Sequence, residues 1–428
     1  MARAPGLVAV LVGASLALAA TAAADRTRWL PLHPAPSIRV EVAAARIATR
    51  IYVAAGFVDA VKPATRLDIY DIPTDRWTTG APMPVSLNHT TAVTHDGKLY
   101  LVDGYMGDFA TFMGGDGLAV AILLEYDPAT DKWRTLPSPP TKRGAVAAGV
   151  IGDELYVAGG WNTSSEDQTR LEVYDFDTGK WRRGPDMRFA RNHVVGAAAS
   201  GKFYAVGGHV HLFITDQVFS YVERFDPKAN RWERVADLNP PRSGAGVTTV
   251  DGRLVVFGGE AKNGVVASAA VFDPLTGLWS PLPDMLTPRH ALGSVTYGNR
   301  VYAIQGARYP AFVRDTDVLE YLDIAPAGAA APKTGRPRLR LSVGPRRAAG
   351  GVWTHVRFRV TSRRGGRIRP VSGATVHFAG SRLRADRRGR ATLVKRLWRP
   401  GVHRAVVKKR GWRTAAAALR VSRRVRSR

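Results

Sequence analysis

The strongest constraint on the fold is a pattern that recurs about every 50 residues, a period typical of repeat arrays. Each copy contains a short apolar run, rich in β-branched and aromatic residues, that ends at a Gly. The six glycines are Gly56, Gly104, Gly160, Gly208, Gly259 and Gly306. The residue before each is also Gly, except at Ala55, Asp103 and Gln305. This pattern predicts copies of one β unit, because such runs are typical of buried strands.

The second half of the unit is stricter, since an Asp precedes a Trp by six residues in five copies. These pairs are Asp71–Trp77, Asp127–Trp133, Asp175–Trp181, Asp226–Trp232 and Asp273–Trp279. The residue two before each Trp is Asp, Asn or Gly, all of which tolerate a left-handed backbone. We therefore predict a hairpin turn in each copy, in which the Asp accepts hydrogen bonds from the following backbone amides.

The repeated Gly pair, Tyr-Asp pair and Trp resemble the kelch repeat over roughly residues 26–324. The resemblance implies an all-β fold in which each copy is a four-stranded blade of a β-propeller. The sixth copy stops at Leu319–Ile324 without a Trp, whereas Thr27–Arg39 carries the Trp and Pro of an outer strand. We expect a six-bladed propeller over 25–324 whose ring is closed by this N-terminal strand, leaving no open sheet edge.

The remaining quarter of the chain differs in charge. Residues 325–428 hold 30 Lys and Arg against one acid, Asp386, while the rest holds 32 basic and 34 acidic residues. After an Ala-, Pro- and Gly-rich linker over 325–337, alternating apolar and Arg positions over 338–422 predict short strands. This segment is similar to small bacterial immunoglobulin-like or carboxypeptidase-regulatory-like β-sandwiches, and a basic tail follows over 423–428.

Two interpretations of this charge remain open. A polybasic domain repels itself unless a polyanion is near, which favours attachment to anionic cell-envelope polymers. A genome rich in G and C would also favour Arg without a functional demand. No motif for sequence-specific nucleic-acid recognition accompanies the charge.

The N-terminus predicts export. Residues 1–24 combine a basic start, a short apolar run and small residues, as a signal peptide does, with an uncleaved anchor as the alternative. We expect a secreted or cell-surface protein without a transmembrane span. The absence of Cys excludes disulfides, thiolate metal sites and Cys nucleophiles, and we expect no cofactor.

Candidate ligand-binding residues follow from the repeat. The residue seventeen positions before the second Gly is Arg in five copies and Leu87 in the other. The two residues that follow it are often Asn or His. Aromatic residues, His209 or Glu260 follow the Gly in five copies. An antiparallel blade brings these positions to one face. The predicted ligand-binding set is Arg39, Asn88, His89, Tyr105, Arg143, Trp161, Asn192, His193, His209, Arg242, Arg289 and His290.

Two interpretations of this set also stay open. Sugars stack on aromatic rings, guanidinium groups hold carboxylates at two points, and in kelch adaptor proteins arginines of this part of the repeat line the ligand-binding face. Alternatively, each Arg bonds backbone carbonyls or an acid, and the aromatic residues only hold the loops in place. Solvated loop histidines are commoner than metal ligands, so we predict no metal, although His209 and His211 lie on one side of an extended segment.

No catalytic motif with a fixed spacing is present, which favours a recognition module that binds a protein or a glycan on one propeller face. The alternative is a carbohydrate-active enzyme that resembles sialic-acid mutarotases. Glu260 would then transfer the proton, and Arg242 or Arg289 would hold the sugar carboxylate. A galactose-oxidase-like copper oxidase is disfavoured, because its crosslinked Tyr–Cys cofactor needs a Cys that this chain lacks.

Overall fold

The structure is a computed structural model that describes residues 28–59, 62–108, 118–162, 166–210, 217–310, 313–326, 339–364, 367–409, 412 and 414–422. The predicted signal peptide and basic tail lie outside these residues, as does nearly all of the predicted linker. The chain divides into two compact units, Met1–Ala327 and Gly328–Arg428. The described residues are all-β, as predicted, and contain no helix with the length and hydropathy of a membrane span.

The described part of the first unit forms six four-stranded antiparallel sheets, here called blades one to six. Blades one to three are β3 (Ala43–Ile47), β4 (Arg50–Ala54), β7 (Leu67–Asp71) and β8 (Arg76–Thr79); β9 (Thr91–His95), β10 (Lys98–Val102), β13 (Leu123–Asp127) and β14 (Lys132–Leu136); and β15 (Ala147–Ile151), β16 (Glu154–Ala158), β17 (Leu171–Asp175) and β18 (Lys180–Arg183).

Blades four to six are β19 (Val195–Ala199), β20 (Lys202–Val206), β21 (Val222–Asp226) and β22 (Arg231–Arg234); β23 (Gly246–Val250), β24 (Arg253–Phe257), β27 (Ala269–Asp273) and β28 (Leu278–Leu282); and β29 (Gly293–Tyr297), β30 (Arg300–Ile304), β33 (Leu319–Asp323) and β1 (Leu30–Pro31).

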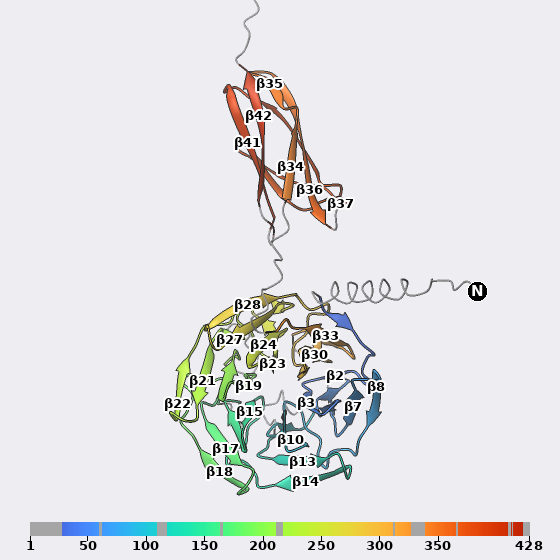
Figure 1. Cartoon of the computed structure of the whole chain (residues 1–428), viewed down its shortest axis with the longest axis vertical. Helices are drawn as coiled ribbons and strands as arrows, with labels where there is room; N and C mark the ends of the chain where they lie inside the picture. Colours follow the sequence, from blue (N-terminus) through green and yellow to red (C-terminus); the bar gives the residue numbers. More distant parts are fainter. Residues whose placement is uncertain are drawn as a thin grey trace, which may run out of the picture. The chain divides into compact units, whose positions relative to one another are not determined.

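The blades are arranged in a ring, with β3, β15, β19 and β23 toward the centre and β8, β14, β18 and β22 at the perimeter (Figure 1). The second strand of each blade has four consecutive buried residues, because blades pack against both of its faces. The apolar cores lie between neighbouring blades. One of them joins Tyr52 and Leu67 of blade one to Leu101 and Leu124 of blade two.

The Asp–Trp interval forms the predicted turn. In all five copies the Asp accepts a hydrogen bond from a following backbone amide at 2.8–3.1 Å, and the residue two before the Trp has a positive φ. Each of these Trp side chains also donates its indole N–H to a carbonyl outside its own sheet, in the segment that comes before the blade, at 2.8–3.1 Å. The repeat therefore fixes the turn and joins successive blades at the perimeter.

The outer strand of blade six comes from the N-terminal segment of the chain. Strand β1 pairs with β33 through Leu30 and Tyr321, which is the arrangement that the sequence predicts. Trp29, beside this strand, is fully buried, and its indole N–H donates to the Pro283 carbonyl at 2.9 Å. The five Trp residues of the Asp–Trp turns make the same kind of bond between blades. Trp29 also packs edge-on against Phe257 of blade five.

The second Gly of each unit forms the inner joint. Its amide donates to the carbonyl of the residue that begins the next blade's innermost segment, at 2.8–3.0 Å in all six cases. The last of these bonds runs from Gly306 to Arg39 and joins blade six to blade one. A side chain does not fit here, because a Cβ on Gly56 would lie 2.6 Å from the Val40 carbonyl oxygen. At the first position Ala55, Asp103 and Gln305 adopt the same left-handed backbone, whereas a Cβ on Gly207 would clash with the Arg242 carbonyl oxygen.

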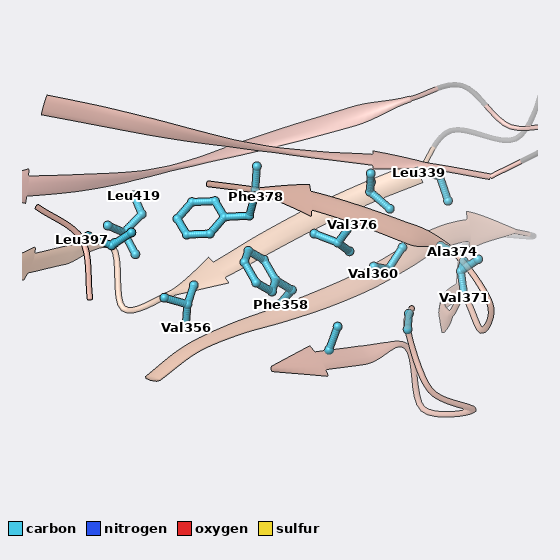
Figure 2. Close-up of a cluster of buried hydrophobic side chains, with 14 of the residues drawn as sticks. Leu339, Val356, Phe358, Val360, Val371, Ala374, Val376, Phe378, Leu397 and Leu419 are labelled. Carbon is cyan, nitrogen blue, oxygen red and sulfur yellow. The ribbon is translucent and has the colours of Figure 1, made fainter. Parts of the chain in front are cut away.

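The described residues of the second unit form two sheets. One consists of β34 (Leu339–Gly344), β36 (Trp353–Arg364), β37 (Arg367–Pro370) and β40 (Arg390–Arg396), and the other of β35 (Arg347–Ala349), β42 (Ala415–Ser422), β41 (Gly401–Lys408), β38 (Thr375–Phe378) and β39 (Ser381–Arg384). A common core includes Phe358 and Phe378, whose ring centroids lie 5.3 Å apart (Figure 2). The likeness of this unit to immunoglobulin-like sandwiches stays a prediction.

The closing strand yields a stability prediction. We expect Trp29→Ala to lower the free energy of unfolding of the propeller by about 3–5 kcal/mol, because it empties a buried site and leaves the Pro283 carbonyl without its donor. Scanning calorimetry of the full chain measures the propeller transition. Leu275→Ala is the control, since Leu275 is 92 % exposed. Equal transitions for the two variants would show that β1 does not hold the ring closed.

Candidate functional site

The candidate site lies on the loop face, defined here as the face that carries the connections between blades and the loops between the second and third strands. These loops include the short hairpins β5 (Phe57–Val58) with β6 (Lys62–Pro63), β11 (Tyr105–Met106) with β12 (Leu118–Ala119), β25 (Glu260–Ala261) with β26 (Gly264–Val265), and β31 (Ala307–Tyr309) with β32 (Val313–Asp315). All residues of the predicted ligand-binding set belong to this end of the blades.

The five arginines of that set are not exposed. Arg39, Arg143, Arg191, Arg242 and Arg289 have 0–1 % of their surface accessible, and each donates to two or three backbone carbonyls of its own blade. Burial lowers the pKa of Arg39, Arg191 and Arg242 to about 10, which leaves them charged at neutral pH. The expected ring of ligand-facing guanidinium groups is therefore corrected: they join strands inside each blade.

Four of the arginines also pair with a buried acid on the third strand of the same blade. The pairs are Arg39–Asp68, Arg143–Glu172, Arg191–Glu223 and Arg289–Glu320, with N–O distances of 2.7–3.1 Å. These bonds satisfy charges that are costly to bury alone.

The two remaining blades show how the pair is replaced. Blade two has Leu87 in the place of the Arg and Leu124 in the place of the acid, and both are fully buried. In blade five, where Ala270 replaces the acid, Arg242 donates to the Ser268 hydroxyl at 2.7 Å. A buried acid therefore occurs at this position only in blades that also contain the buried Arg. This indicates that the acid and the Arg stabilise the blade as a pair.

The aromatic residues of the predicted set are also enclosed. Tyr105 and Trp161 are 1–2 % exposed, pack against each other with Ala119, and the Tyr105 hydroxyl donates to the Trp161 carbonyl. Phe57, in the same position of blade one, is fully buried. These rings hold the loops in place, so their faces are not available for stacking on a sugar.

A group of imidazoles and carboxylates does gather at the axis of the propeller. We call it the axial cluster; its members are Glu41, His89, His193, His209, Glu260 and His290. Glu41 Oε1 lies 3.3 Å from His89 Nε2 and 3.8 Å from His193 Nε2. Glu260 lies 3.9 Å from His209 Nδ1 and 3.7 Å from His290 Nδ1. The stacked rings of His193 and His209, with centroids 4.6 Å apart, join the two halves.

Half of this cluster comes from one position of the repeat, two residues after the buried Arg or Leu87. That position has a positive φ in all six blades, where it is Glu41, His89, Ala145, His193, Gly244 or Ala291. Backbone bonds link these residues around the axis, for example from the Glu41 amide to the Ala291 carbonyl at 3.0 Å. Because all six blades share it, the left-handed backbone belongs to the repeat, and the side chain at this position varies between blades.

Burial changes the protonation of the cluster. It lowers the pKa of His89 to about 3, with His290 and His209 as lesser causes, and lowers the pKa of His193 well below its usual value. It also raises the pKa of Glu41 well above its usual value, with Glu260 and then Asp315 adding to the effect. The two imidazoles are therefore neutral at pH 7.

A cavity of about 140 Å³ adjoins Glu41, His89 and His193 and is lined further along by Thr91, Ser294 and other residues of the innermost strands. Small-molecule pockets usually measure about 300–1,000 Å³, so this cavity suits an ion or a few waters. Larger ligands would have to bind on the loops around its mouth.

The structure thus brings together His89, His193, His209, His290 and Glu260 from the sequence predictions. Asn88 and Asn192 lie beside them as fully buried partners of the imidazoles. Sequence reasoning missed Glu41, although it occupies the same repeat position as His89 and His193. Residues 109–117, between β11 and β12, and His211 lie outside the described residues.

Comparisons with known proteins agree with this architecture. A kelch-repeats domain model named for KLHDC2, KLHL20 and DRC7 matches residues 146–324, and two kelch motif models match 38–84 and 86–140. The chain therefore contains kelch repeats, as the sequence pattern predicted.

Among curated proteins, Kelch-like protein terF of Aspergillus terreus is 32 % identical over 52 % of this chain and 50 % of its own length. Human kelch repeat and BTB domain-containing protein 13 is 36 % identical over 31 % of this chain and 29 % of its length. The chain spans at most about half of these relatives. The solved structure of YjhT matches with a TM-score of 0.56 and 17 % identity over 67 % of this chain and 95 % of that chain, which shows the fold alone.

The structural role of the buried pairs can be tested in blade four. We expect Arg191→Leu and Glu223→Leu each to cost about 3–5 kcal/mol of unfolding free energy, because each leaves the other charge buried without its partner. The double variant copies Leu87 and Leu124 of blade two, so it should cost clearly less than the sum. Chemical denaturation of the four proteins measures this coupling.

The control for this cycle is the exposed pair Arg183–Asp186, where coupling should stay below about 1 kcal/mol. Additive effects in the Arg191–Glu223 cycle would contradict the structural role and return Arg191 to the list of candidate ligand-binding residues.

Proposed function

We propose that the protein is an exported recognition module whose loop face binds a protein partner, and whose basic second unit attaches to anionic envelope polymers. The observation that carries the first part is a set of exposed apolar side chains on the loop face. Ile38, Leu286 and Tyr309 are 49–54 % exposed, and all three lie in loops that border blade six. Leu118, on a hairpin of blade two, is 56 % exposed.

Several features favour a protein over a glycan. Exposed apolar and aromatic side chains are typical anchors of protein interfaces. The rings that would stack on a sugar, Tyr105 and Trp161, are enclosed. Kelch-repeat propellers are generally protein-binding modules, which supports the same choice. Export is supported by the signal-peptide pattern of residues 1–24.

The enzymatic alternative is less well supported. Glu260 lies beside two imidazoles, as proton transfer would require. The two arginines that would hold a sugar carboxylate, Arg242 and Arg289, are instead enclosed and bonded to backbone carbonyls. The geometry therefore favours recognition over a mutarotase.

The loop-face proposal predicts a face-specific loss of binding. Surface and exported proteins of the producing organism are crosslinked to the purified full chain, and a captured protein is then measured by itself in a binding titration. We expect the variant Ile38→Asp/Leu286→Asp/Tyr309→Asp to weaken binding roughly tenfold or more, because it removes apolar anchors. The control, Leu275→Asp/Leu278→Asp, changes exposed leucines of a turn on the opposite face.

Equal binding by both variants would exclude the loop face as the interface. Binding of the wild-type chain to a glycan array, without any captured protein, would favour a glycan ligand instead.

The polyanion proposal rests on one sheet of the second unit. Along β36, Val356, Phe358 and Val360 are buried, while Arg357 and Arg359 are exposed on the opposite side. Arg359 stands directly opposite Arg390 of β40, a pairing of like charges that the single carboxylate of Asp386, 3.7 Å from Arg390, offsets only in part. These three arginines and Arg388 line a shallow groove.

This groove predicts a salt-dependent affinity for polyanions. We expect the full chain to bind inorganic polyphosphate and polygalacturonate, with log K falling linearly as log salt rises. Arg357→Gln/Arg359→Gln/Arg390→Gln should weaken binding more than Arg382→Gln/Arg384→Gln/Arg420→Gln, which removes the same charge from the other sheet. Equal losses would assign the binding to diffuse charge, and no binding at physiological salt would exclude the attachment role.

A further inference from the structure

We propose that Glu41, His89 and His193 bind one divalent transition-metal ion of the zinc class at the axis of the propeller. The three side chains come from blades one, two and four and occupy the same left-handed position of the repeat. Two imidazoles and a carboxylate form a common donor set for zinc and similar ions.

The spacing of the donor atoms fits such an ion. One donor atom from each residue lies within 4.8 Å of the other two. Glu41 Oε1 is 3.3 Å from His89 Nε2 and 3.8 Å from His193 Nε2. Tetrahedral bonds of about 2.1 Å place neighbouring ligand atoms about 3.4 Å apart. Small side-chain movements would therefore complete the coordination.

Second-layer hydrogen bonds point the correct nitrogen of each ring at the site. His89 Nδ1 lies 2.6 Å from Asn88 Oδ1, and His193 Nδ1 contacts Asn192 Oδ1 in the same way. The amide of Asn88 is held in this orientation because its Nδ2 donates to the Tyr105 and Gly107 carbonyls, at 3.2 and 3.3 Å. Asn192 Nδ2 donates to the Asp167 carboxylate.

An oxygen acceptor at Nδ1 places the ring proton there and leaves the lone pair on Nε2. Both Nε2 atoms therefore direct lone pairs toward the carboxylate of Glu41, and at 3.3 Å the His89–Glu41 contact needs a cation or a proton between its two acceptors. A single shared proton can bridge only one nitrogen–oxygen pair. The arrangement has three converging acceptors, and a metal ion satisfies all of them together.

The surroundings also suit a metal. Glu41 and His89 are 3–8 % exposed, which shields the bonds from water. Three protein ligands leave a fourth position on a zinc-class ion for water or a small ligand, and the cavity of about 140 Å³ adjoins all three residues.

The test uses untagged full-length protein, freed of metal with a chelator, and measures Zn²⁺ binding by calorimetry and by competition with a coloured chelator. We expect one equivalent bound tightly. Glu41→Gln, His89→Gln and His193→Gln should each weaken that binding by about tenfold or more, and Asn88→Ala should weaken it by roughly 10–100-fold. His95→Gln is the matched control, because His95 lies outside the cluster, stacked on Phe176.

A second measurement keeps the proposal testable if a variant unfolds. Co²⁺ added to the wild-type protein should give a visible absorption spectrum of a low-coordinate site, which Zn²⁺ abolishes. Absence of tight Zn²⁺ binding to the wild-type chain would overturn the proposal in favour of a shared proton. Unchanged binding by folded His89→Gln and His193→Gln would also overturn it, as would loss of binding only in His209→Gln or His290→Gln.

Discussion

The structure depends on the ring of hydrogen bonds that runs from the second Gly of each blade to the first residue of the next blade's innermost segment. Each bond contributes only about 1 kcal/mol by itself. All six occur at 2.8–3.0 Å, and the one from Gly306 to Arg39 closes the circle. In every copy a Cβ on this Gly would lie 2.5–2.9 Å from a carbonyl oxygen of its own blade's innermost segment, which explains why Gly is kept at this position.

Two positions beside this ring of hydrogen bonds differ in their role. The residue whose carbonyl accepts the bond sends its side chain into its own blade, and it is an Arg bonded to carbonyls in five copies and Leu87 in the other. Two residues later the backbone is left-handed and lies at the axis. In blades three, five and six that position is Ala or Gly, which serves the fold alone, whereas Glu41, His89 and His193 place donor atoms there. The fold therefore accepts different side chains at this position, and in three blades the side chain carries a metal-ligating group.

The sequence predicted the elements that depend on local spacing. The Asp–Trp interval specifies a turn whose chemistry is contained within seven residues, and the all-β class and the kelch repeats follow from its repetition. It did not predict which way the Arg side chains point, because periodicity places a residue at the start of a strand without orienting its side chain. The joint replacement of Arg and acid by Leu87 and Leu124 in blade two was the available signal for internal pairing. Glu41 was missed because its blade has Val40 where blades two and four carry Asn before His.

The central claim is that the six inner joints form one cooperative ring that holds the axial positions. Hydrogen exchange followed by mass spectrometry, on peptides that contain the six glycines, tests it most directly. We expect the amides of the six glycines, Gly56, Gly104, Gly160, Gly208, Gly259 and Gly306, to exchange together at the slowest rate in the propeller, because they open only when the whole ring unfolds. Faster exchange at Gly306 than at the other five would show that the joint between blades six and one opens alone, and would contradict the claim.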